Sequence, residues 1–154
     1  MRDDKRRAAG MAIRRQVLGD AHVDLAIAST TELTADFQDL LTRYAWAEIW
    51  SRPGLDLRTR RVLVIGTLLA LGRWDEFKMH VRAALVEGGF SQADVREIVL
   101  QQAIYCGMPA AHMAFQAVRE ILAGCLIEEA PRRRRGRPPA ARRSGPALAK
   151  RSSR

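Results

Sequence analysis

The sequence has few cysteines and no long apolar run, and both absences limit the classes of protein to which it can belong. Cys106 and Cys125 are its two cysteines among 154 residues. They are too few for a disulfide framework or a zinc site, so we expect two reduced thiols and no bound metal. The longest apolar run, residues 62–71, is far shorter than the roughly 20 residues that a membrane-spanning helix needs. No secretory signal follows the charged N-terminus, so we expect a cytoplasmic protein without membrane contact.

Acidic residues are absent from residues 132–154, whereas ten of the 26 Lys and Arg residues lie there. The net charge of +9 therefore comes from this tail, because residues 1–131 have a net charge of −1. The tail has almost no large apolar side chains and cannot offset the entropy lost on ordering. We expect one domain over residues 1–130 and a disordered Arg-rich tail over residues 131–154.

A sustained alternation of apolar and polar residues, which would predict strands, is also missing. Gly, Pro, Ser and Asp instead separate stretches of ten or more residues, and this pattern predicts about six helices in an all-α domain. Gly19 and Gly124 are expected helix ends, and His22 is expected in a loop. The predicted helices cover about residues 4–18, 34–45, 56–72, 74–87, 91–105 and 109–124.

Glu76 and His80 are four residues apart on the predicted helix over residues 74–87. This spacing lets the carboxylate orient the imidazole and favour its protonated form beside an apolar face. The pair is therefore a candidate acid/base site. An ion pair on the helix surface would have the same spacing.

Aromatic residues are scarce, yet several gather around one tight turn with arginines. The predicted turn covers residues 49–55. The residues before and within it are Tyr44, Trp46, Glu48, Trp50 and Arg52, and those after it are Arg58, Arg60 and Arg61. Tryptophans can wall an apolar pocket, and planar guanidinium groups bind carboxylates in a bidentate manner. The alternative is that the aromatics belong to the core and the arginines to a solvated face.

Four segments together resemble the 4-carboxymuconolactone decarboxylase family, over most of residues 5–124. They are residues 14–24, 44–55, 70–85 and 103–111. The most specific part is Trp50-Ser-Arg-Pro-Gly-Leu followed by Glu76-x-x-x-His80. The resemblance implies a decarboxylase acting on 4-carboxymuconolactone in protocatechuate catabolism, releasing CO2 and an enol-lactone.

The wider family, similar to the alkylhydroperoxidase D proteins, implies an all-helical fold and a homo-oligomer, a trimer or a hexamer, with sites partly between subunits. Its peroxidase members use Cys-x-x-Cys-x-x-x-His. Arg73, Glu76 and His80 occupy the corresponding positions here, so both thiols are missing and the sequence argues against thiol redox chemistry.

The resemblance further implies cofactor-free chemistry, because the lactone itself accepts the electrons of the breaking bond. His80 is then the general acid or electrophile, Glu76 orients it, and His22 is an alternative proton donor. A wall of Trp46, Trp50 and Trp74 would keep water from the departing carboxylate. The candidate substrate-binding residues are Arg15, Trp46, Glu48, Trp50, Arg52, Arg58, Arg60, Arg61, Trp74 and Tyr105.

Two other hypotheses compete with this one. Arg135-Gly-Arg-Pro-Pro resembles the core of an AT-hook, so the helical domain would be a non-catalytic scaffold with a DNA-binding tail. Alternatively, the fold is kept and the enzyme acts on a related lactone. A nucleic-acid partner is expected only through the tail.

Overall fold

The computed structural model describes residues 2–135, and the side chains of residues 3–124. These residues form seven α-helices and one π-helical segment, without strands, and the predicted all-α fold class is confirmed. None of the described helices is long and apolar enough to cross a lipid bilayer. In chain order the elements are α1 (Arg2–Leu18), α2 (Asp20–Ala28), α3 (Glu32–Leu40), η1 (Leu41–Trp50), α4 (Leu57–Ala70), α5 (Trp74–Val86), α6 (Gln92–Cys106) and α7 (Met108–Arg135).

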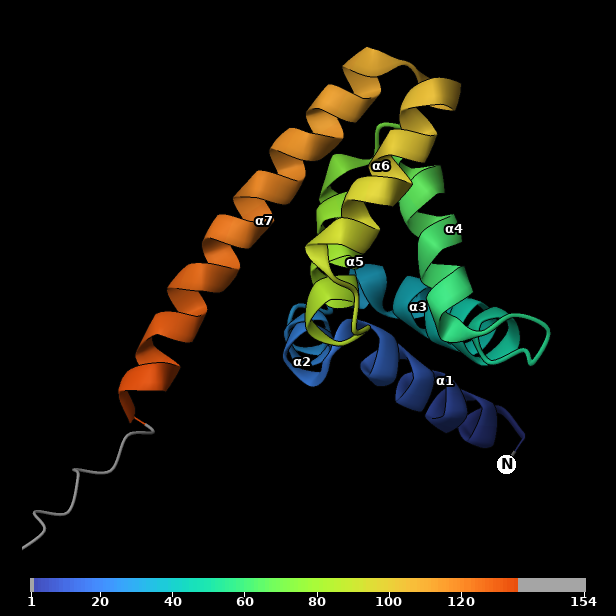
Figure 1. Cartoon of the computed structure of the whole chain (residues 1–154). Helices are drawn as coiled ribbons and strands as arrows, with labels where there is room; N and C mark the ends of the chain where they lie inside the picture. The colour runs from blue at the N-terminus through green and yellow to red at the C-terminus, as the bar shows by residue number, and fades with distance from the viewer. Residues whose placement is uncertain (1, 136–154) are drawn as a thin grey trace, which may run out of the picture.

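The larger core lies where α4, α5, α6 and α7 pack together (Figure 1). Apolar residues repeat at helical spacings along these four elements, so each turns one apolar face inward. The fully buried side chains of this core include Ile65, Leu69, Phe77, Val81, Val95 and Val99.

A second, smaller core forms between α1, α2, η1 and α5. Val17, Leu18, Val23, Trp46 and Ala83 are its buried residues. Here α1 and η1 approach closely at Gly10, where an added Cβ would lie 2.1 Å from the carbonyl oxygen of Thr42. A side chain at this position would force the two helices apart.

The predicted helix over residues 34–45 is longer than expected and divides into two elements. It begins at Glu32, because Thr31 and Thr34 form a capping box, and it continues as the π-helix η1 to Trp50. π-Helices are rare in proteins overall, but those that occur are often found at functional sites. No pattern in the sequence predicted this one.

His22 lies in helix α2 and not in the predicted loop. Gly19 has a φ of 84° and ends α1, as predicted, but it also directly precedes the first residue of α2. Asp20 then lies in the first turn, where its charge suits the helix dipole. The loop prediction was wrong because one left-handed glycine suffices to turn the chain between two helices.

The helix ends predicted from caps agree with the structure, except at the last helix. Asp56 accepts a hydrogen bond of 2.6 Å from the Thr59 backbone, and Ser91 caps α6. The predicted end at Gly124 is wrong, because α7 continues to Arg135. Residues 131–135 of the predicted tail are thus helical, and residues 136–154, with most of the AT-hook-like motif, lie outside the described residues.

We expect Leu69→Ala to lower the free energy of unfolding by about 2–5 kcal/mol, because it leaves a cavity in the larger core. Leu69 is 1% exposed, whereas Leu33, on α3, is 92% exposed. Leu33→Ala is therefore the matched control and should change stability by less than about 0.5 kcal/mol. Urea unfolding at one protein concentration measures both variants, and equal losses would contradict the assignment of the core.

Candidate functional site

The candidate site is built around the buried imidazole of His80, on α5. The His80 side chain stacks on Trp50 of η1, with ring centroids 6.2 Å apart and an interplanar angle of 6°. The Trp50 ring in turn lies 5.1 Å from that of Trp46, between centroids. Three residues predicted for the site therefore lie together in the structure.

The pKa of His80 is lowered to about 4, first by burial and then by the positive charges of Arg61 and His22. His80 is thus neutral at neutral pH. The prediction that Glu76 favours the protonated form was wrong: Glu76 is exposed and His80 is buried, although they are one turn apart. Burial therefore outweighs the effect of a solvated carboxylate.

Arg61 of α4 places a guanidinium group in the interior of the molecule. Its side chain is 3% exposed, and Nη2 donates a hydrogen bond of 3.5 Å to the carbonyl oxygen of Gln16. Burial lowers the pKa of Arg61, and the nearby charge of Glu87 raises it. The sequence left open which arginine reaches a substrate. Of the candidate arginines, Arg61 is the one that the structure buries, and its positive charge acts on His80.

Four buried side-chain nitrogens have no hydrogen-bond partner among the described residues. Guanidinium and indole nitrogens can only donate, and a neutral imidazole nitrogen can donate or accept. A buried polar group without a partner costs free energy, and a hydrogen bond to an oxygen-rich ligand near any of these atoms would offset that cost. The atoms are Arg14 Nε, Trp46 Nε1, Arg61 Nη1 and His80 Nδ1.

Arg14 is a buried residue that the sequence analysis missed in favour of its neighbour Arg15. The guanidinium group of Arg15 donates to Asp20 and Asp24 over 3.0 and 2.7 Å, so it joins α1 to α2 at the corner. A helical period could have identified Arg14, since Gly10, Arg14 and Val17 are buried at spacings of four and three.

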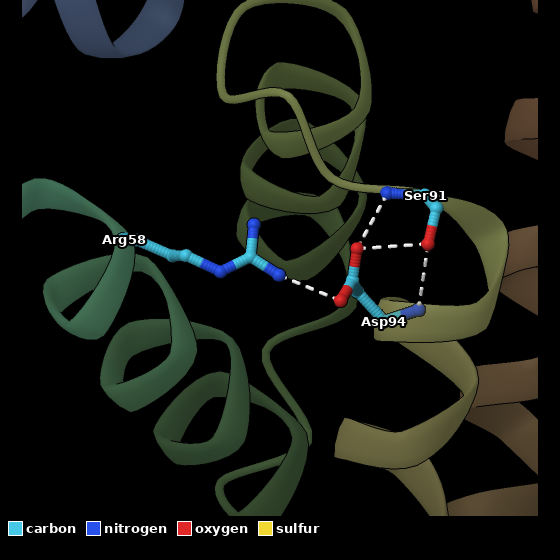
Figure 2. Close-up of polar contacts among 3 residues, drawn as sticks. All are labelled: Arg58, Ser91 and Asp94. Atoms are coloured by element: carbon cyan, nitrogen blue, oxygen red, sulfur yellow. Dashed lines mark hydrogen bonds and ion pairs between the residues drawn. The ribbon is translucent and has the colours of Figure 1, made fainter.

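Arg58 makes contacts within the fold that were not part of its predicted role in substrate binding. Figure 2 shows its guanidinium group against Asp94, at the start of α6, and the Nη2 to Oδ1 distance is 2.6 Å. The other carboxylate oxygen of Asp94 accepts hydrogen bonds from the backbone and hydroxyl groups of Ser91. Arg58 also lies over the ring of Phe90, at 4.1 Å from its centroid. It therefore links α4 to the cap of α6.

Several other predicted residues do not lie with His80 in this chain. Glu48 pairs with Arg6 over 2.8 Å, and Arg52 is exposed and accepts through its carbonyl group from Arg60. Trp74 packs against Phe77 at the larger core, so it does not extend the wall of Trp46 and Trp50. The remaining two, Glu76 and Tyr105, are exposed.

His22 lines a cavity of about 120 Å³ between α1, α2 and α5. Burial lowers the pKa of His22, and the charge of Arg14 lowers it further. The positive charge of His22 in turn lowers the pKa of His80, and the proton-donor roles proposed for the two histidines stay predictions.

The described residues show no clear place for a metal ion. No group of three or more His, Cys, Asp or Glu side chains among them is arranged to hold one. Cys106 has a free thiol whose Sγ atom lies 3.3 Å from the Gln102 side-chain oxygen, and the side chain of Cys125 lies outside the described residues.

Comparison with known proteins gives a consistent result. The model of the carboxymuconolactone decarboxylase family matches residues 35–120. The 4-carboxymuconolactone decarboxylase of Acinetobacter baylyi is 39% identical over 121 residues, which are 79% of this chain and 90% of the relative. The nitrosuccinic acid decarboxylase of Metarhizium robertsii is 38% identical over 101 residues, 66% of this chain and 70% of the relative. A 4-carboxymuconolactone decarboxylase of Pseudomonas putida is 48% identical over 44 residues, 28% of this chain and 92% of the relative.

We expect the His80 ring to titrate near pH 4 when followed by NMR, with the signals assigned by His22→Gln and His112→Gln. Because this pKa lies below the usual 6.5, the unfolded chain binds the proton first as the pH falls. The contribution of His80 to stability is therefore complete above pH 6.5 and declines toward pH 4. Arg61→Met should raise the pKa while leaving it below 6.5, since burial is the larger cause. A titration at or above pH 6.5 in the unmodified protein would contradict the burial of His80.

Proposed function

This chain belongs to the carboxymuconolactone decarboxylase family and is a decarboxylase, and from that premise we propose that its substrate is 4-carboxymuconolactone. The proposed products are CO2 and β-ketoadipate enol-lactone, in protocatechuate catabolism. The observation that carries this proposal is the buried guanidinium group of Arg61, which has an unpartnered Nη1 and whose positive charge reaches the buried, neutral His80. Such a site suits an anion that must lose a carboxylate and gain charge on a carbonyl oxygen.

The substrate supplies its own electron acceptor in this mechanism. When the C–C bond to the carboxylate breaks, its electron pair moves through the ring alkene to the lactone carbonyl oxygen and CO2 leaves. The resulting dienolate takes one proton at the carbon next to the carbonyl group, which gives the enol-lactone. The protein then has to bind the carboxylates, stabilise one oxyanion and supply one proton.

The described side chains offer a group for each of these tasks. Arg61 binds a substrate carboxylate with its free Nη1, because a guanidinium group is a strong donor to such anions. The neutral His80 donates a hydrogen bond to the developing oxyanion, and the stacked Trp50 ring holds the imidazole in place. A bound dianion also raises the pKa of His80, which favours uptake of a proton by the ring. His80 is then the proton donor, with His22 as the alternative.

A second substrate is favoured by the relative from Metarhizium robertsii, whose name states that it decarboxylates nitrosuccinic acid. That compound is also a dicarboxylic acid, and its nitro group can accept the electron pair of the breaking bond. A site that binds carboxylates and stabilises an oxyanion serves both reactions. The two substrates therefore have to be compared on the same protein.

We further propose that the protein is a homo-oligomer, a trimer or a hexamer, assembled through an apolar surface at the junction of α6 and α7. Leu100 and Ile104 form an exposed apolar stripe one helical turn apart on α6, and Tyr105, which is 77% exposed, and Met108 are exposed at its end, where Gly107 turns the chain into α7. Water-exposed apolar groups in one such stripe are typical of subunit contacts. The proposed occupant is a second copy of this chain.

We expect purified protein, with chelator and without added cofactor, to convert 4-carboxymuconolactone to the enol-lactone with release of CO2. His80→Ala should lower kcat by about a hundredfold or more if His80 transfers the proton. His112→Ala is the matched control, because His112 is exposed on α7, and it should keep full activity. Nitrosuccinic acid is assayed in parallel, and a higher kcat/KM for it would replace the proposed substrate. Normal turnover by a folded His80→Ala variant would remove His80 from its role.

We expect Ile104→Glu to convert the oligomer to smaller species, because it places a charge in the α6–α7 surface. Native mass spectrometry measures the subunit number. Gln92→Glu adds the same charge to an exposed position at the other end of α6 and should keep the assembly intact. A monomeric unmodified protein would contradict the proposal.

A further inference from the structure

A cavity of about 240 Å³ lies between α1, α2, α3 and η1, apart from the site around His80. His80, Trp50 and Arg61 are not among its lining residues. Its wall combines apolar side chains with several polar ones and contains two arginines. The lining residues are Arg7, Met11, Arg14, Ile27, Thr30, Ala35, Gln38 and Thr42.

Arg14 is the buried cation of this cavity. Its side chain is 5% exposed, and Nε has no hydrogen-bond partner among the described residues. Burial lowers the pKa of Arg14, and no carboxylate raises it, in contrast to Arg15, where Asp20 and Asp24 do so. A buried guanidinium group without an anion is costly, and a bound anion offsets that cost.

The rest of the wall limits what kind of anion fits. Met11 and Ile27 give it an apolar side, which suits a short carbon chain better than an inorganic ion. The Gln38 amide group can add a hydrogen bond, whereas the Thr42 hydroxyl group already donates to the Gln38 carbonyl oxygen over 2.8 Å. Arg7 is largely exposed and 3.6 Å from Asp39, so its positive charge at this cavity is partly balanced.

We propose that this cavity is a second binding site, which takes a small organic carboxylate, and that Arg14 binds the carboxylate group. The site is separate from the decarboxylase site, so a ligand there binds whether or not the proposed substrate is correct. Arg14 also couples this cavity electrostatically to the first site. Its positive charge lowers the pKa of His22, and the positive charge of His22 lowers the pKa of His80.

Calorimetric titration of the full chain at low salt with sodium butyrate tests this proposal. Butyramide is the neutral comparison, because it has nearly the same shape without the charge. We expect saturable binding of one butyrate per chain, and binding of butyramide weaker by about tenfold or more, as for the loss of a hydrogen bond to a charged group. Equal affinity for the two compounds, or no saturable binding of butyrate, would overturn the proposal.

Arg14→Met and Arg15→Met form a matched pair that localises the bound butyrate. Arg14→Met removes the proposed anchor and should weaken binding by about tenfold or more, whereas Arg15→Met, on the exposed side of α1, should leave it unchanged. Ala35→Phe narrows the cavity from the exposed helix α3 without touching Arg14, and should also weaken binding, with Ala35→Ser as its control. Unchanged affinity in folded Arg14→Met and Ala35→Phe, or loss of binding in Arg61→Met alone, would place the butyrate elsewhere.

Discussion

The close contact of α1 with η1 is the constraint on which both polar sites depend. Gly10 lets the backbones meet beside Thr42, and this contact holds η1 so that Trp46 joins the smaller core and Trp50 reaches His80. The same contact forms two sides of the cavity that contains Arg14. A larger residue at position 10 would therefore disturb both the site around His80 and the cavity that contains Arg14.

The two cores have different roles: the larger one stabilises the fold, and the smaller one lies at the polar groups of the candidate sites. The core of α4 to α7 is apolar and supplies most of the hydrophobic stabilisation, as in ordinary helical domains. The smaller core includes or adjoins all four buried nitrogens that lack partners. Functional sites often accept such unfavourable groups, and a rigid neighbouring core keeps them in place. Arg58 and Asp94 brace that neighbouring core at the start of α6.

Sequence reasoning predicted those parts of the fold that depend on local chemistry. Caps at Asp56 and Ser91 and the glycine at position 19 marked helix ends, because each acts within a few residues. It failed where tertiary contacts decide. The π-helix packs against α1, and His80 is buried and stacked on Trp50 of η1, and neither contact can be read from the local sequence. The spacing of the arginines near the turn made all of them candidates for binding the substrate. Only burial, which the structure shows, distinguishes Arg61 from the exposed Arg58 and Arg52.

The one-residue corner at Gly19 also limits how this sequence can change over generations. A side chain at Gly19 would meet strained backbone geometry and the Glu87 carboxylate, 2.7 Å from an added Cβ. Inserting one residue into the first turn of α2 would move every later side chain of that helix by about 100° around its axis. Val23 would then leave the smaller core, and His22 would leave its cavity. Descendants of this protein are therefore expected to vary in the length of other connections before they vary at this one.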